Sequence, residues 1–157
     1  MASMIAKRAR DIEPRTTTSY PRMFHERVLP REVRRLGDAF GLTSFGVNLM
    51  TLMPGKASSL RHHHSHEDEF VYVLEGEVVL RTDHGDELLT PGMVVGFRAG
   101  DGNGHQLVNR SADNARYLVV GNRHPNDVCA YTDDDLAVRQ REDGTLLFSR
   151  KTGDPLE

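Results

Sequence analysis

The chain has 157 residues, which is enough for a single domain with its own hydrophobic core. Its net charge of −3, with basic and acidic residues interspersed, argues against a nucleic-acid-binding surface, and no apolar run approaches the ~18 residues of a membrane-spanning helix. The only cysteine, Cys129, has no intrachain partner for a disulfide, and the first residues lack the apolar core of a secretory signal, so we expect a cytoplasmic protein.

The sequence divides into three segments of different character. Residues 1–35 are rich in Arg and Pro and weakly patterned, so we predict an N-terminal arm that is partly extended. The basic residues of this arm are typical of a solvated tail. Residues 36–122 contain most of the predicted strands. Residues 123–157 are predicted to form a C-terminal extension that packs on the strand-rich region or on a partner subunit.

Short strands follow one another along the middle segment. Over residues 45–53, the residues Phe, Val, Leu, Thr and Met occupy every second position, and Pro54-Gly55 ends the run. This pattern predicts a strand followed by a turn. Further strands are predicted at residues 70–76, 77–82, 93–97, 105–109 and 115–122, with two possible ones at 136–141 and 145–149. Strands this short and this closely spaced, with glycines at the turns, predict an all-β sandwich or barrel.

A histidine cluster lies between two of these strands, in the segment SSLRHHHSHEDEFVYVLEGE. Residues two apart on a strand share a face, so His62 and His64 are predicted to point into a barrel together while His63 points away. A carboxylate shortly downstream and an imidazole from another strand would complete a mixed nitrogen and oxygen site, for which Glu69 and His105 are candidates. Such a site suits zinc, iron, nickel or manganese rather than calcium.

The cluster resembles the first motif of the cupin superfamily. That motif has a glycine, an HxH pair, a glutamate after three or four residues and a glycine after six more. The spacing from His64 through Glu69 to Gly76 matches it. The upstream Gly55 lies one residue too far from His62, which is a small departure.

A second stretch resembles the second cupin motif, which is a glycine, five residues, PxG, two residues, a histidine, three residues and an asparagine. The matching residues are Gly92, Gly100, His105 and Asn109. Arg98 replaces the proline of the motif, and the loop before the histidine is two residues longer. The glycines are expected at corners where the backbone tolerates no side chain.

The resemblance spans about residues 45–122 and implies a single-domain double-stranded β-helix, the jelly-roll barrel of small bacterial cupins, with one divalent transition-metal ion (Zn, Fe, Ni or Mn) inside. The ligands that it implies are His62, His64, Glu69 and His105. A second HxH pair, His64 and His66, lies too close to Glu69 for the motif. Choosing Glu67 as the carboxylate would place Leu74 at the glycine position. We therefore expect His63 and His66 to be exposed polar residues.

Such a ligand set allows several functions. Three imidazoles and one carboxylate leave up to two positions on an octahedral ion for water, a substrate oxygen or dioxygen. With a redox-inert ion we predict a metal-assisted isomerase or epimerase that moves a proton on a small sugar or keto-acid-like substrate. An iron-dependent dioxygenase is the enzyme alternative, and a non-catalytic small-molecule-binding protein is the other. The sequence does not identify the catalytic acid or base.

Other polar residues receive weaker predictions. Four could face a substrate, although packing or surface positions are commoner for such residues: Tyr72, Arg98, Tyr117 and Arg123. Three isolated histidines are predicted at the surface: His25, His84 and His124. Asn109 is predicted to hydrogen-bond within its strand or turn.

The expected barrel also predicts an assembly. A small barrel leaves strand edges and an apolar outer face, which natural β proteins cover. Closed two-fold pairing is the commonest oligomer of soluble chains, so we predict a homodimer. Residues 20–33 and 128–149 are each long enough to add a strand to a partner subunit.

Overall fold

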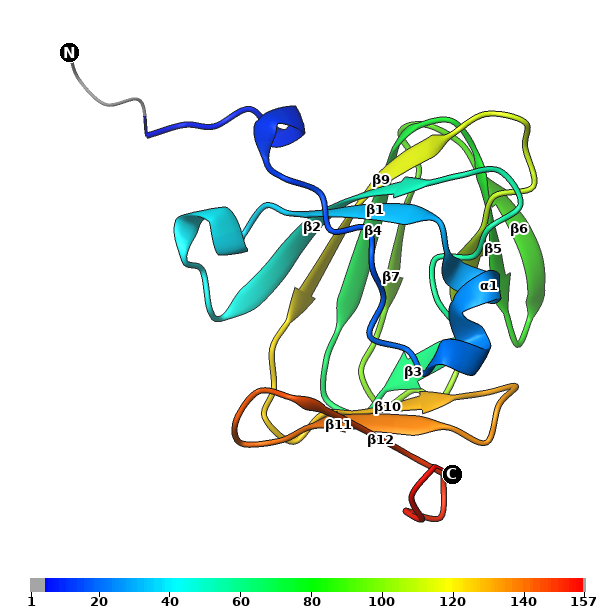
Figure 1. The fold of residues 1–157 in the computed structure, drawn as a ribbon. Helices are drawn as coiled ribbons and strands as arrows, with labels where there is room; N and C mark the ends of the chain where they lie inside the picture. The colour runs from blue at the N-terminus through cyan, green and yellow to red at the C-terminus, as the bar shows by residue number, and fades with distance from the viewer. Residues whose placement is uncertain (1–4, 157) are drawn as a thin grey trace.

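The computed structural model describes residues 5–156 and consists mainly of antiparallel strands (Figure 1). In chain order the strands are β1 (Arg31–Arg35), β2 (Phe45–Leu52), β3 (His62–His64), β4 (Glu69–Glu75), β5 (Val78–Thr82), β6 (Gly85–Leu89), β7 (Val94–Phe97), β8 (Gln106–Val108), β9 (Ala115–Asn122), β10 (Val128–Tyr131), β11 (Ala137–Gln140) and β12 (Leu146–Ser149). The helical elements are short: η1 (Ala9–Asp11), η2 (Arg22–Phe24), α1 (His25–Val28) and η3 (Asp38–Phe40). Within the described residues, no helix has both the length and the hydrophobicity needed to cross a membrane.

One wall of the barrel is a five-stranded antiparallel sheet with the strand order β1-β2-β9-β4-β7. Successive residues of a strand point to opposite faces of a sheet. On β4, Val71 and Val73 are therefore buried between the walls, whereas Phe70 and Tyr72 lie on the outer face. The same alternation turns Glu69, at the start of β4, toward the barrel interior.

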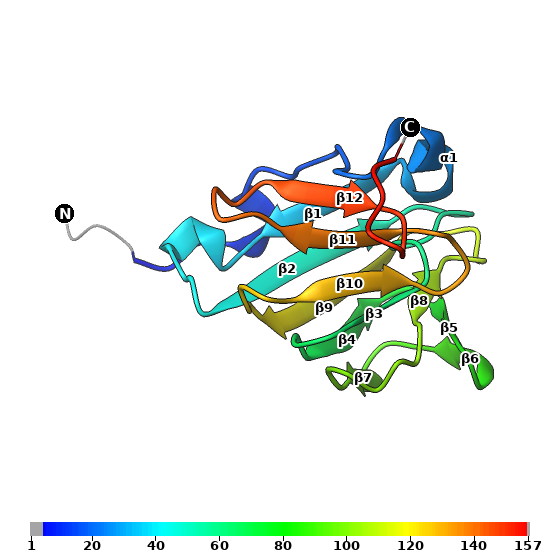
Figure 2. The same ribbon diagram turned by 90° about the horizontal axis from the view of Figure 1, so that it is seen from below.

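The opposite wall consists of two sheets, β12-β11-β10-β3 and β6-β5-β8. Figure 2 shows the first of these with its four strands in succession. Reciprocal backbone hydrogen bonds join the two sheets: the N–H of His62 donates to the carbonyl of His105 (3.1 Å), and the N–H of His105 donates to the carbonyl of His62 (2.9 Å). Two of the predicted metal ligands are thus neighbours in the backbone ladder.

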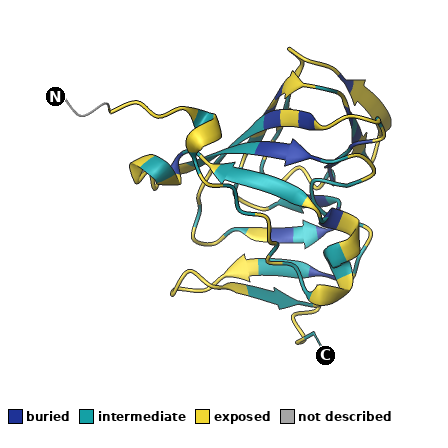
Figure 3. Ribbon diagram, turned by 45° about the horizontal axis from the view of Figure 1, so that its top comes forward, coloured by how far each residue is buried: buried dark blue, intermediate teal, exposed yellow. Residues whose placement is uncertain are grey.

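Two hydrophobic clusters hold the walls together. The first fills the barrel and contains Met50, Leu52, Val71, Val73, Val78, Leu80, Leu89, Leu107, Ala115 and Tyr117. The second contains Val28, Leu60, Cys129, Tyr131 and Leu136. Tyr20 and Phe24 from the N-terminal segment and Phe148 from β12 pack against this second cluster. Figure 3 shows the buried residues along the barrel strands and the exposed residues along the loops and the first described segment.

The structure confirms the all-β prediction and places strands β2, β4, β5, β7, β8, β9, β11 and β12 where the sequence pattern predicts them. It also forms β3, the strand on which the prediction for His62 and His64 depends, and it adds β1, β6 and β10, which the pattern did not predict. Strands β1 and β6 have the sequences REVRR and GDELL, and they lie at sheet edges where charged side chains reach solvent. The sheets therefore take strands from all three segments of the chain.

Candidate metal centre

The four ligands implied by the motif spacing meet between the two walls. His62 and His64 lie on β3, Glu69 begins β4, and His105 directly precedes β8. The Oε2 atom of Glu69 lies 3.6 Å from Nε2 of His64 and 3.9 Å from Nε2 of His62. Its Oε1 atom lies 3.4 Å from Nε2 of His105. All three imidazoles therefore turn the Nε2 atom toward one carboxylate.

Neighbouring groups hold two of these rings in place. Nδ1 of His62 lies 2.8 Å from the carbonyl oxygen of Leu60, which only accepts, so Nδ1 carries the proton and Nε2 keeps its lone pair. The ring of Phe97 stacks on that of His105, with centroids 3.6 Å apart and planes 2° apart. Both ring nitrogens of His105 are buried and have no hydrogen-bond partner among the described residues. Buried nitrogens without a partner are unfavourable, so this ring fits a site where an ion binds.

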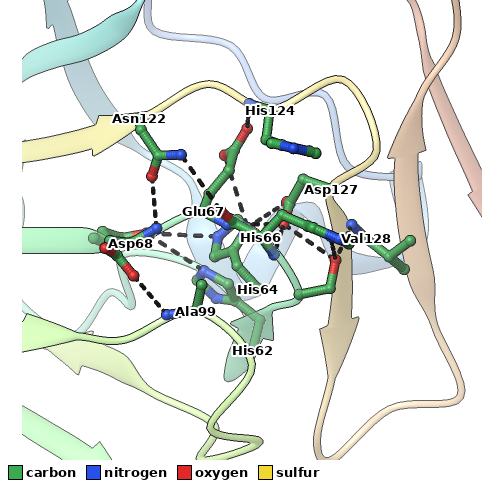
Figure 4. Close-up of polar contacts among 12 residues, drawn as sticks. His62, His64, His66, Glu67, Asp68, Ala99, Asn122, His124, Asp127 and Val128 are labelled. Atoms are coloured by element: carbon green, nitrogen blue, oxygen red, sulfur yellow. Dashed lines mark hydrogen bonds and ion pairs between the residues drawn. The ribbon is translucent and has the colours of Figure 1, made fainter.

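His64 is oriented by Asp127, which the sequence analysis did not identify. Oδ2 of Asp127 lies 2.7 Å from Nδ1 of His64, and an ionised carboxylate only accepts, so His64 donates from Nδ1 and presents Nε2 to Glu69. Oδ1 of Asp127 accepts the backbone N–H groups of His66 (2.8 Å) and Glu67 (3.2 Å) (Figure 4). Carboxylates commonly fix metal-binding histidines in this way. Asp127 lies in the loop before β10, 63 residues from His64, and no local pattern marks it.

The charges around the site favour a bound cation. Burial raises the pKa of Glu69, but the three neighbouring imidazoles, whose Nε2 atoms lie 3.4–3.9 Å from its carboxylate, outweigh burial and hold the pKa well below its usual value. Burial lowers the pKa of His64, but hydrogen bonds to Asp127 and Glu69 outweigh it and raise the pKa to about 10. A positive charge is therefore favourable between these carboxylates. A metal ion that displaces the proton would supply it.

The donor atoms of His62, Glu69 and His105 all lie within 4.8 Å of one another, and Nε2 of His64 lies 3.6 Å from Glu69. Two atoms that each bind an ion at about 2.1 Å lie roughly 3.0–3.4 Å apart at octahedral or tetrahedral angles. The contacts of Glu69 with the three imidazoles, at 3.4–3.9 Å, are close to that spacing. A set of three imidazoles and one carboxylate suits zinc, iron, nickel or manganese.

Two further groups of possible donors lie beside this set. Cys129 lies near His62 and His64, but burial raises the pKa of its thiol, and the thiolate is the form that binds metals. Glu67 and Asp127 lie near Nδ1 of His64. Asp127 is already bonded to His64 and to two backbone N–H groups, and Glu67 accepts a backbone hydrogen bond of its own.

The remaining histidines lie outside the ligand set. His66 is exposed and stacks on the half-buried His124, with centroids 4.6 Å apart and planes 11° apart. His63 was predicted to be exposed but is half-buried, because β3 pairs with β10 and places it beside Ala130. His84 is exposed in the β5–β6 hairpin. His25 is half-buried, and its Nε2 atom hydrogen-bonds to a backbone carbonyl of the N-terminal segment.

Two cavities meet at the ligand set. The outer cavity, of about 700 Å³, opens at the surface and is lined by His64 and Glu67. The inner cavity, of about 120 Å³, lies inside the barrel and is lined by His62 and His105. Glu69 lines both cavities. The candidate metal centre therefore lies between a polar entrance and an interior chamber.

The residues considered for substrate contact are divided by the structure. Tyr117 lines the inner cavity, and Arg123 lines the outer one. Tyr72 points outward from β4. Arg98 is exposed and lines a surface groove that shares Glu69 with the outer cavity. Asn109 is buried, and its side-chain amide donates to two backbone carbonyls at 2.8 Å, so it holds a turn as predicted.

Comparisons with known proteins agree with this geometry. The profile of the Cupin domain family matches residues 48–121. A sugar phosphate isomerase of the cupin superfamily from Silicibacter pomeroyi is 47% identical in sequence, with 94% of each chain covered and a TM-score of 0.90. The chain belongs to the cupin superfamily. Its barrel is the single-domain cupin fold that the two motifs implied, and cupin domains commonly bind a metal ion.

Two further solved structures resemble this cupin. A provisionally assigned sugar phosphate isomerase of Acidithiobacillus ferrooxidans is 31% identical, with 81% of this chain and 80% of that chain covered and a TM-score of 0.72. A polyketide cyclase of Streptomyces resistomycificus is 22% identical, with 80% of this chain and 84% of that chain covered and a TM-score of 0.65, which shows a shared fold alone. No protein with a curated description matches the sequence significantly.

Proposed function

We propose that this cupin is a metal-dependent isomerase that acts on a sugar phosphate. The observation that supports this most directly is the meeting of the four ligands at the junction of two cavities, in a chain that is 47% identical to a sugar phosphate isomerase. The outer cavity contains amide, guanidinium and carboxylate groups that suit an oxygen-rich substrate. Isomerisation moves a proton between adjacent carbons and consumes no oxidant.

Residues around the outer cavity have distinct proposed roles. A divalent ion held by the four ligands would polarise a carbonyl or hydroxyl group of the substrate. Glu67 lies beside His64, with its Oε2 atom 3.9 Å from Nδ1, and can carry a proton from one substrate carbon to the next. Arg35 and Arg123 lie at the rim on either side of Asp38, at 3.6 and 2.7 Å from its oxygens. Two guanidinium groups so placed can bind a phosphate.

Incubation with a panel of aldose and ketose phosphates in D₂O tests this function. Proton NMR should show conversion of one substrate, with deuterium incorporated at the reacting carbon. Protein loaded with zinc, manganese or nickel should be active, and His105→Ala should abolish activity. His84→Ala is the matched control, because His84 is exposed in a hairpin away from the site.

Two outcomes would contradict the proposed isomerase. Substrate-dependent oxygen uptake by the iron form alone, measured with an oxygen electrode, would favour a dioxygenase. Tight binding of a sugar phosphate without turnover in any metal form would favour a binding protein without catalytic function.

We also propose a homodimer formed through the outer face of β4 and β7. Phe70, Tyr72, Leu74 and Val94 form a neighbouring apolar group on this face, each 39–52% exposed. Exposed apolar patches of this kind mark protein interfaces. From the sequence, residues 20–33 and 128–149 were considered for the interface. Strands from these two regions already pair within the chain, β1 with β2 and β10 with β3.

Light scattering coupled to size exclusion tests the dimer. Wild-type protein should show twice the 17.6 kDa mass of one chain, and Tyr72→Lys should shift it toward 17.6 kDa. Leu88→Lys is the matched control, because Leu88 is an exposed apolar residue of β6 in another sheet. A wild-type mass of 17.6 kDa at micromolar concentration would rule out the dimer.

A further inference from the structure

The inner cavity is lined by polar groups as well as by metal ligands. Its volume of about 120 Å³ is bounded on one side by the ligand set and elsewhere by Met50, Val71 and Leu107. Ser58, Ser59 and Tyr117 add hydroxyl groups to this lining, and Asn48 adds an amide. A cavity needs about 10–15 Å³ of such volume for each water, so this chamber can hold several waters or a ligand fragment of a few heavy atoms.

The hydroxyl of Tyr117 is unpaired in this chamber. The side chain is 1% exposed, and its hydroxyl has no hydrogen-bond partner within residues 5–156. The hydroxyl of Ser58 lies nearby, where it accepts the N–H of Leu107 (3.0 Å) and lies 3.4 Å from the hydroxyl of Ser59. Buried hydroxyl groups without partners are unfavourable and rare in native structures, so the Tyr117 hydroxyl can accommodate a partner from outside the chain, either a water or an oxygen of a ligand.

The hydroxyl is available as a donor. Burial raises the pKa of Tyr117, so the phenol keeps its proton at physiological pH. Polar groups also lead from Ser58 to the ligand set: the hydroxyl of Ser59 lies 3.4 Å from that of Ser58 and 3.2 Å from Nδ1 of His62. A molecule in the chamber would therefore meet both the Tyr117 hydroxyl and ligands of the candidate metal centre.

We propose that the inner cavity receives an oxygen-bearing end of the ligand and that Tyr117 donates a hydrogen bond to that oxygen. The identification of the ligand as a sugar phosphate rests on the proposed isomerase function, whereas the hydrogen bond from Tyr117 does not. Such a bond would hold the reacting end of a sugar phosphate inside the barrel while the phosphate stays in the outer cavity. It would also give the hydroxyl the partner that it lacks.

Replacing Tyr117 with phenylalanine tests this role, with acetohydroxamate as the probe. This small molecule has two adjacent oxygens, as an enediol has, and binds divalent metals. In the zinc-loaded protein, Tyr117→Phe should weaken acetohydroxamate binding about five- to tenfold by calorimetry. The variant should retain its zinc and have the same melting temperature as wild type or a higher one, because the hydroxyl makes no bond within the fold.

Tyr20→Phe is the matched control, because the Tyr20 hydroxyl accepts the backbone N–H of Leu60 at 3.3 Å and does not line the cavity. This variant should melt a few degrees lower and bind the probe as wild type does.

Equal probe affinity of Tyr117→Phe and wild type would overturn the inference. The inference would also be overturned if Tyr117→Phe melted at a lower temperature, as Tyr20→Phe is expected to, or failed to fold. The Tyr117 hydroxyl would then have a structural role. Probe binding that depends on Tyr117, without turnover of any sugar phosphate, would refute the proposed isomerase and leave this inference in place.

Discussion

Replacing Asp127 with asparagine should weaken metal binding without changing a ligand. Oδ2 of Asp127 accepts from Nδ1 of His64, and Oδ1 accepts the N–H groups of His66 and Glu67. Asparagine keeps only one acceptor oxygen. If that oxygen stays with the two N–H groups, the amide NH₂ faces His64 and drives its proton onto Nε2, the atom that faces Glu69. If the amide is rotated the other way, its oxygen accepts from His64, but its NH₂ group then faces the backbone N–H groups of His66 and Glu67, and donors face donors.

The size of the effect follows from the burial of this contact. Loss of the carboxylate partner of a metal-binding histidine weakens metal affinity about 10- to 100-fold, which corresponds to about 1.4–2.7 kcal/mol. The His64–Asp127 contact is 2.7 Å long, and the two side chains are only 17% and 11% exposed. Because water competes little for so short and buried a bond, we expect the upper half of this range, about 30- to 100-fold.

Competition against a fluorescent zinc chelator at neutral pH measures this change. Asp135→Asn is the control, because Asp135 is an exposed acidic residue of the same C-terminal region and pairs with Arg150 at 3.4 Å, away from the site. Circular dichroism would verify that both variants are folded. Equal zinc affinity of the two variants would refute the role of Asp127 in orienting His64.

After dialysis, alanine at any of the four proposed ligands should remove most bound zinc, whereas alanine at His63 or His66 should not; equal loss from all these variants by elemental analysis would contradict the ligand set. Cys129 should resist iodoacetamide in the folded protein and react after unfolding, because burial raises the pKa of its thiol; mass spectrometry that finds rapid labelling of native protein would disprove this. Gly76→Ala should lower the free energy of unfolding by about 2 kcal/mol or more, because Gly76 has a φ of 69° and a Cβ there would lie 2.6 Å from a carbonyl oxygen. Gly55→Ala, at a φ of 78° with no atom within 4 Å of the new Cβ, should cost only about 1 kcal/mol; similar losses in urea denaturation would show that the steric clash contributes nothing.

The sequence by itself determined the strands with clear alternation and the ligand candidates. A strand repeats every two residues, so His62 and His64 share a face once β3 forms. The spacing of Glu69 and His105 resembled the cupin motifs closely enough to suggest the remaining ligands. Each of these inferences depends on short-range spacing along the chain.

Only the tertiary structure decided which groups surround those ligands. Asp127 reaches His64 across 63 residues because β10 pairs with β3, and no local pattern records that pairing. Tyr117 could have faced either side of its strand, until the pairing of β9 with β4 placed its hydroxyl in the inner cavity. The charged edge strands β1 and β6 were not predicted because one edge of each lacks a partner strand and the hydrophobic alternation is weak there. Contacts between distant strands depend on how the whole chain packs, and a local period does not contain that information.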